Sequence, residues 1–252
     1  MTPDFSPFKD RREAGAQLAA ALMYLKKDSP VVLALPRGGV PVAYEVAQAL
    51  GAPLDVLLVR KIGAPGFPEL GLGAVVDGQR HQRVINEELV NRLRPPPGYL
   101  EAEEQRQLDE IERRRKIYCG DRPPVPIQGR TVIVVDDGIA TGGTMGAALK
   151  ALAREGVAKL IFAVPVAPRS ALDSLCAVVD DGVCLFTQSN FQAVGQYYKN
   201  FEQTTDEEVI VLLDAAANES GELGAGTEVG AIPPDAVGGQ IPPDASIPGK
   251  PA

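Results

Sequence analysis

The sequence has few of the residues on which metal and disulfide sites depend. Its single histidine is His81, and its three cysteines, Cys119, Cys176 and Cys184, are far apart and form no CxxC pair. These numbers exclude an internal site that needs two histidines, and they argue against a zinc site, a disulfide framework and a Ser–His or Cys–His mechanism. Because His81 has polar and charged neighbours, we expect it in a solvated strand or turn.

Basic residues and long apolar runs are also scarce. The 252 residues include 25 Lys and Arg against 33 Asp and Glu, a formal net charge of −8. A general nucleic-acid binder needs a basic face that displaces phosphate counterions, so we expect no nucleic-acid partner. No segment approaches the ~20 apolar residues that span a bilayer, and the polar start MTPDFSPFKDRREAG lacks the apolar core of a secretory signal. We therefore expect a cytoplasmic protein with reduced thiols and no membrane contact.

The segment 218–252 differs in composition from the rest of the chain. It contains seven glycines, six prolines and no aromatic residue, and the motif IPPDA occurs in it twice, at Ile232–Ala236 and Ile241–Ala245. Such a segment buries too little apolar surface to offset the entropy of ordering it. We expect a disordered tail, either a solvated spacer or the carrier of a partner-binding motif in the repeat.

The remaining body, residues 8–217, alternates between predicted strands and helices. The strands are the apolar runs Val31–Leu35, Leu54–Val59, Thr131–Val135, Lys159–Val164 and Val183–Phe186. The helices are expected from Asp10 to Lys27, over Val40–Leu50, from about Thr144 to Glu155, and from Thr205 to about Ala217. Strands without alternation that are separated by helices indicate an α/β fold, with a mainly parallel central sheet flanked by helices.

Residues 77–128 interrupt this alternation and predict an insertion. Asp77–Arg83 is typical of a polar hairpin, Arg94–Gly98 (RPPPG) is a break, and Tyr99–Tyr118 predicts a long, highly charged helix. The cationic run Arg113–Lys116 is either the solvated face of this helix, balanced by the preceding glutamates, or a patch for an anion or a nucleic acid.

The strongest chemical signal is the stretch VIVVDDGIATGGT, Val132–Thr144. It predicts a buried strand, two carboxylates at its end, a loop of small residues and a helix N-terminus. Ligands bind at this edge of an open α/β sheet, and the backbone N–H groups of Ala140–Thr144 can converge on an anion. The loop lacks the lysine of a nucleoside-triphosphate P-loop. Because Asp136 and Asp137 would repel a phosphate, we expect them to face hydroxyls or a metal ion, which suits a sugar phosphate such as phosphoribosyl pyrophosphate.

This stretch resembles the phosphoribosyl-pyrophosphate motif of the type I phosphoribosyltransferases, in which an apolar strand and two acids precede T-G-x-[ST]. The resemblance implies that Asp136 and Asp137 hold the ribose 2- and 3-hydroxyls and a Mg²⁺ ion. It implies a 5-phosphate loop formed by Ala140, Thr141, Gly142, Gly143 and Thr144, with Gly138 as a further ligand-binding residue.

A second segment, LPRGGV at Leu35–Val40, follows the first predicted strand. Arg37 supplies charge there, and Gly38 and Gly39 allow close backbone approach, so the segment predicts another anion site on the same sheet edge. In the family it corresponds to the pyrophosphate loop.

A third segment, Val59–Val75, begins with Arg60 and Lys61 and continues as a Gly/Pro-rich loop. It resembles the family's flexible loop, which closes over the reacting centre, and the resemblance makes Arg60 and Lys61 catalytic cations; the alternative is a rigid surface loop in which both are solvated. Together with the segments IERRRKIY, AVPVAP and F-x-AVG-x-YY, these motifs resemble one bacterial branch of the family over residues 8–213.

The sequence says least about the acceptor, the molecule to which an enzyme of this family transfers the phosphoribosyl group. In the family's enzymes for 6-oxopurines, the position of Ala140 carries an aspartate, so the alanine resembles the adenine and orotate types instead. Residues 183–201 predict a hood in which Phe191, Tyr197 and Tyr198 either stack on the acceptor or belong to the core.

The resemblance implies a phosphoribosyltransferase, a pentosyltransferase that moves the phosphoribosyl group from phosphoribosyl pyrophosphate to a base or another nitrogen acceptor and releases pyrophosphate. Two alternatives stay open: a non-catalytic sensor of phosphoribosyl pyrophosphate or a nucleotide, and a hydrolase or phosphorylase of a phosphorylated ribose. Family members often form dimers, so a homodimer is possible.

Overall fold

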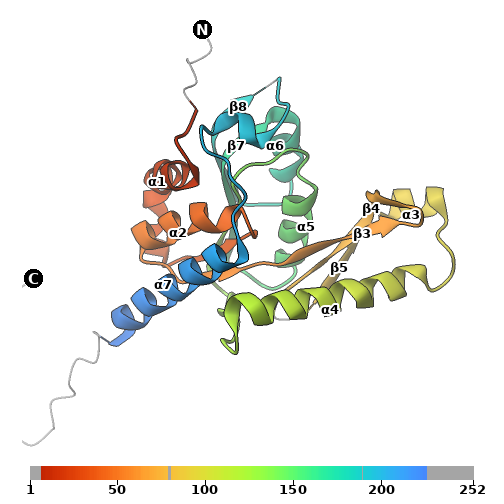
Figure 1. Ribbon diagram of the computed structural model, residues 1–252, viewed down its shortest axis with the longest axis horizontal. Coiled ribbons are helices and arrows are strands. Elements are labelled where there is room, and N and C mark those ends of the chain that lie inside the picture. Colours follow the sequence, from red (N-terminus) through yellow and green to blue (C-terminus); the bar gives the residue numbers. More distant parts are fainter. Residues whose placement is uncertain (1–6, 79–80, 189, 226–252) are drawn as a thin grey trace, which may run out of the picture.

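The computed structural model describes residues 7–78, 81–188 and 190–225. Its main sheet has five parallel strands in the order β2-β1-β6-β7-β8 (Figure 1). Their bounds are β1 Val31–Ala34, β2 Leu54–Val56, β6 Thr131–Val135, β7 Lys159–Pro168 and β8 Asp181–Gln188. The α/β class and the parallel sheet are therefore confirmed, although β2 ends earlier than predicted and β7 and β8 are longer.

Helices cover both faces of this sheet (Figure 1). One face packs against α1 (Arg11–Leu22), α2 (Gly39–Leu50) and α7 (Asp206–Ala225), and the other against α5 (Gly143–Leu152) and α6 (Arg169–Leu175). Because successive strand side chains point to opposite faces, each strand divides between two cores: Ile133 and Val135 join the first, Val132 and Val134 the second. This double burial explains the unbroken apolar runs.

The predicted helix starts are present, and two short helices were not predicted. Asp10 caps α1 by accepting a hydrogen bond from the Glu13 N–H at 2.9 Å, and Thr205 accepts one from the Glu208 N–H at 3.1 Å. After Leu22 the first helix tightens into η1 (Met23–Asp28). The helices missed from the sequence are α3 (Glu87–Leu93) and α6.

An arm of antiparallel strands and helices projects from the main sheet (Figure 1). It comprises β3 (Val59–Ala64), β4 (Phe67–Val76), β5 (Gln82–Ile85), α3 and α4 (Tyr99–Cys119). The predicted long helix is confirmed, and the polar segment after Asp77 does connect two antiparallel strands. The prediction of a loop over Val59–Val75 is wrong: the segment is the β3–β4 hairpin, so the arm starts at Val59 and not at Asp77.

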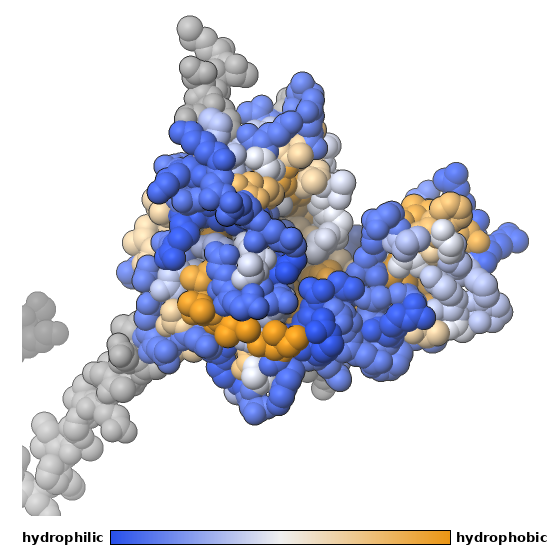
Figure 2. Space-filling model, in the orientation of Figure 1, coloured by the Kyte–Doolittle hydropathy of each residue, from blue (hydrophilic) through white to orange (hydrophobic). Residues whose placement is uncertain are grey.

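The cationic run of α4 is fully engaged by carboxylates. Arg113 and Arg114 both bind Glu110, and Lys116 binds Asp121. Arg115 instead reaches inward, where its two Nη atoms lie 3.0 Å from Asp55 and 2.8 Å from Asp77. The run is therefore no free anion patch, and Figure 2 shows a mostly hydrophilic surface along α4.

The first part of the predicted hood is β8, the edge strand of the main sheet, which leaves residues 190–201 as the hood. This segment contains η2 (Val194–Tyr197) and pairs with the start of the body: the Phe8 N–H donates to the Tyr197 carbonyl at 2.9 Å, and the Lys199 N–H donates to the Phe8 carbonyl at 2.7 Å.

Helix α7 continues to Ala225, beyond the predicted end at Ala217. The Tyr44 hydroxyl donates to Glu219 at 3.0 Å, so the first residues assigned to the tail lie against α2. The rest of the predicted tail, with both IPPDA copies, lies outside the described residues. In the described ranges no helix has the length and apolar character needed to cross a membrane.

Candidate active site

The two predicted anion loops lie side by side because their strands are neighbours. Strands β1 and β6 pair in parallel with Ala34 opposite Val135, so both end at the same sheet edge. The Leu35 N–H then donates to the Val135 carbonyl at 2.9 Å, which carries the pairing into the loops. This edge is where open α/β sheets bind ligands.

Gly38 and Gly39 are glycines for reasons of space. A Cβ on Gly38 would lie 2.0 Å from Oδ2 of Asp137, and one on Gly39 would lie 2.8 Å from the Val135 carbonyl oxygen. The φ of Gly38 is −60°, which any residue adopts. The loop therefore packs its backbone directly on the two acids, a contact that a side chain would prevent.

Asp136 and Asp137 differ in their partners. Oδ1 of Asp136 accepts a hydrogen bond from the Asp137 N–H at 2.8 Å, whereas Oδ2 of Asp137 lies 2.8 Å from Nε of Arg11. Burial, followed by the charge of Asp137, raises the pKa of Asp136 well above its ordinary value. Burial also raises the pKa of Asp137, and the hydrogen bond from Arg11 opposes that rise. Two adjacent carboxylates with raised pKa values, at the sheet edge where ligands bind, are typical of functional sites.

The loop after the acids is accessible and leads into a helix N-terminus. Ala140, Thr141, Gly143 and Thr144 are exposed, and Gly142 has a φ of 80°, a left-handed conformation that favours glycine. The first turn of α5 leaves backbone N–H groups without intrahelical acceptors, with the positive end of the helix dipole behind them. The segment can therefore hold a phosphate beside the acids.

The acids fit a Mg²⁺ ion that is shared with a phosphate ligand. Over the described ranges, no three Asp, Glu, His or Cys side chains gather as a metal site. Mg²⁺ does not need such a cage, because it keeps several waters and binds one or two carboxylates together with substrate phosphates. Asp136 and Asp137 supply oxygen donors of that kind.

The three predicted cations have protein partners. Nη1 of Arg37 lies 3.6 Å from Asp206 on α7. Nε of Arg60 donates to Gln107 on α4 at 3.0 Å, and Nζ of Lys61 donates to Glu69 across the β3–β4 hairpin at 2.8 Å. Arg37 thus lies in the glycine loop next to the acids, while Arg60 and Lys61 belong to the arm and contact other arm residues.

The hood aromatics are mainly core. Tyr197 and Tyr198 are 8% and 6% exposed and pack with Phe8, which agrees with their interpretation as core rather than as stacking surfaces. Phe191 is half-buried and stacks on Tyr197 at a ring distance of 5.2 Å. Of the three, Phe191 is the most exposed.

Gly138 makes room for the hood. A Cβ at this position would lie 2.6 Å from Cγ1 of Val194 and 3.0 Å from Cγ1 of Val166. The hydroxyl of Tyr198 donates to the Asp137 carbonyl at 2.6 Å. The hood therefore packs against the main chain at Asp137 and Gly138.

The chain matches the phosphoribosyl transferase domain over residues 10–200. The chain belongs to the phosphoribosyltransferase family. It is 45% identical over 227 residues to two Mycobacterium tuberculosis proteins, "Putative phosphoribosyl transferase MT0597" of strain CDC 1551 and "Putative phosphoribosyl transferase Rv0571c" of strain H37Rv. The match covers 90% of this chain but 51% of each relative, so the chain spans about half their length.

A solved structure of similar sequence is that of TT1426 from Thermus thermophilus. It is 47% identical, with a TM-score of 0.73, and the match covers 82% of this chain and 98% of that one.

The sequence does not indicate Arg11, a further residue that contacts the acid pair. It opens α1, far in sequence from the acids, and its guanidinium lies 3.9 Å from the ring centroid of Phe201 while it pairs with Asp137. Its position so far from the motif gave no local signal; only the fold brings α1, the hood and β6 together.

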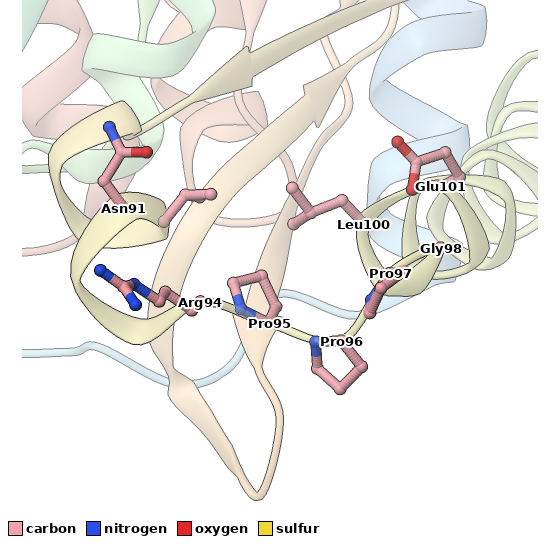
Figure 3. A pocket seen from close by; sticks show the side chains of 9 residues that line it. Asn91, Arg94, Pro95, Pro96, Pro97, Gly98, Leu100 and Glu101 are labelled. Carbon is pink, nitrogen blue, oxygen red and sulfur yellow. The ribbon is translucent and has the colours of Figure 1, made fainter.

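A cavity of about 510 Å³ lies elsewhere, at the junction of α3 and α4 (Figure 3). Proline rings of Pro95, Pro96 and Pro97 line it, with Arg94 and Glu101 as its ionisable groups. Every lining residue belongs to the arm, so this cavity is separate from the edge that carries the acids.

Proposed function

We propose that the chain transfers the phosphoribosyl group of phosphoribosyl pyrophosphate to a nitrogen acceptor. The acceptor nitrogen forms a bond to C1 of the ribose with inversion, the C1–oxygen bond breaks, and pyrophosphate leaves with the bonding electrons. The acceptor nitrogen then loses its proton to water. The observation that carries this proposal is the acid pair between a glycine loop and an accessible helix N-terminus.

Each part of the substrate has a matching group at this edge. Asp136 and Asp137 accept hydrogen bonds from the ribose 2- and 3-hydroxyls, and residues 138–144 bind the 5-phosphate through backbone N–H groups. The backbone of Gly38 and Gly39 approaches the pyrophosphate, and Arg37 supplies positive charge as it leaves. Bound Mg²⁺ would neutralise further charge on the leaving group, held by Asp136, Asp137 and the substrate.

The arm and the hood have less specific roles. Arg60 and Lys61 serve the leaving group if the β3–β4 hairpin closes over the edge. Lys61 then has to exchange Glu69, its partner within the same hairpin, for the pyrophosphate. Ala140 cannot act as a proton acceptor, so the acceptor is not expected to be a 6-oxopurine. Phe191 is the hood aromatic that we assign to contact with it.

Release of pyrophosphate tests this function. The protein is incubated with phosphoribosyl pyrophosphate, Mg²⁺ and a panel of bases, and pyrophosphate is measured with and without each base. Base-dependent pyrophosphate supports transfer. Base-independent release would point to hydrolysis, and ligand binding without release would point to a sensor; either result would overturn the proposed transferase.

A further inference from the structure

We infer that Arg11 is a positioning residue for ribose binding, because it fixes the Asp137 carboxylate and ties it to the hood. This inference rests on the proposed function of the acid pair. Arg11 is not expected to touch the substrate; it acts through Asp137.

The guanidinium of Arg11 is held on three sides. Nε donates to Oδ2 of Asp137 at 2.8 Å, Nη1 donates to the Glu202 carbonyl at 2.7 Å, and Cζ lies over the Phe201 ring, 3.9 Å from its centroid. The Arg11 side chain is 12% exposed and that of Asp137 14%. A planar fork that is stacked and bonded in this way has little freedom, which distinguishes it from a flexible surface pair.

These contacts give the two carboxylate oxygens of Asp137 different surroundings. Oδ2 contacts Arg11 on one side and the backbone of Gly38 on the other, where a hypothetical Cβ would lie only 2.0 Å from it. This oxygen is therefore enclosed by protein. The two carboxyls of the acid pair also contact each other. With Oδ2 held by Arg11, we assign Oδ1 of Asp137 to a hydroxyl of the ribose. Without Arg11 the carboxylate could rotate about its Cβ–Cγ bond, and the oxygen facing the ligand would be less well placed.

The hood controls the same acid through its backbone. The Tyr198 hydroxyl donates to the Asp137 carbonyl at 2.6 Å, and the Tyr198 ring stacks on the Phe201 ring with 5.0 Å between their centroids. The Phe201 ring also contacts the guanidinium of Arg11. Side chain and main chain of Asp137 are therefore both attached to the hood, which links the expected acceptor region with the ribose site.

Arg12 provides a matched control. It is the next residue of α1, and its Nε lies 2.7 Å from Glu45, so it too pairs with a carboxylate of another element. Its side chain is 57% exposed and its partner lies on α2, away from the acid pair. Arg11→Met and Arg12→Met change the charge near the α1 N-terminus by the same amount.

The test compares two ligands by titration calorimetry: ribose 5-phosphate, and tetrahydrofurfuryl phosphate, which keeps the ring and the phosphate but lacks the ring hydroxyls. Wild type should prefer ribose 5-phosphate. Arg11→Met should reduce this preference by about tenfold, equivalent to about 1.4 kcal/mol, while Arg12→Met leaves it unchanged. Arg11→Lys keeps the charge without the fork and should give an intermediate preference, which preserves the test if Arg11→Met folds poorly.

A purely structural role would weaken both ligands equally and leave the preference intact, which would overturn the inference. In the Asp137→Asn background, Arg11→Met should cause no further loss of preference; a full additional loss would also overturn it, since Arg11 would then act independently of Asp137. If wild type itself shows no preference for ribose 5-phosphate, the proposed ribose site fails together with the inference.

Discussion

Nη1 of Arg37 lies 3.6 Å from the carboxylate of Asp206, the first residue of α7. The pair joins the glycine loop after β1 to a helix from the other end of the chain, and Asp206 also accepts a hydrogen bond from Tyr118 of α4 at 2.6 Å. The cation proposed for the pyrophosphate is therefore shared with an acid of the protein. Any pyrophosphate that binds Arg37 has to compete with Asp206.

Asp206→Asn should strengthen pyrophosphate binding. The substitution removes the competing charge, and the asparagine oxygen can still accept the Tyr118 hydrogen bond. Both side chains are partly exposed, at 32% and 45%, so screening limits the gain to about 0.2–1 kcal/mol, at most about fivefold in affinity. Calorimetry with pyrophosphate and Mg²⁺ measures it, with Asp214→Asn on the same helix as a control. Weaker binding by Asp206→Asn would contradict the assignment of Arg37.

Asp136→Asn and Asp137→Asn should both weaken binding of phosphoribosyl pyrophosphate but differ in their effect on stability. Each removes a charge-assisted hydrogen bond worth about 1.5–3 kcal/mol, roughly a 10- to 150-fold loss of affinity. Asp136→Asn relieves a carboxylate that burial and Asp137 disfavour, so its melting temperature should hold or rise at pH 7. Asp137→Asn should melt lower, because it leaves Arg11 without its anion. Unchanged affinity in both variants would refute the ribose site.

Gly38→Ala should impair ligand binding without backbone strain. With a φ of −60° alanine is allowed, but its Cβ would overlap Oδ2 of Asp137 at 2.0 Å and displace the carboxylate. We expect at least a tenfold loss of affinity for phosphoribosyl pyrophosphate, about 1.4 kcal/mol. Gly146→Ala within α5 is the control: its Cβ would meet Leu175 at 3.5 Å, an ordinary contact, and helix propensity should add about 0.5–1 kcal/mol of stability. Equal binding by Gly38→Ala and wild type would show that the loop does not constrain the acid.

The sequence predicted the sheet and the motif loops well because each depends on local pattern. Buried parallel strands read as continuous apolar runs, and Thr131–Val135 has the predicted bounds. The β3–β4 hairpin was not recognised, because its Gly and Pro residues are equally common in loops, and pairing with a distant partner decides between them.

The tertiary contacts of the site also depend on partners that are distant in the sequence, so local patterns could not predict them. Arg11 and Val194 meet residues 137 and 138 only after α1 and the hood have packed on β6. Their identities alone, an arginine in a helix and a valine at the start of the short helix η2, favour no particular partner. Val194 explains why residue 138 is a glycine, because a side chain there would collide with it.

Arg115→Met should destabilise the protein far more than Arg113→Met, although both residues lie in one cationic run. Arg115 is the counter-charge of Asp55 and Asp77, which are 7% and 3% exposed, and its loss leaves two buried carboxylates without their shared guanidinium. Breaking a buried pair in this way costs about 3–5 kcal/mol. Arg113 is 58% exposed, and Arg114 also binds its partner Glu110, so its removal should cost at most about 1 kcal/mol. Urea unfolding measures both free energies of unfolding.

The loss of Arg115 should also loosen the arm, because Asp55 is in β2, Asp77 follows β4 and Arg115 is in α4. Hydrogen exchange of the α4 amides would detect this loosening. Similar unfolding free energies for the two variants would show that this ion cluster does not anchor the arm.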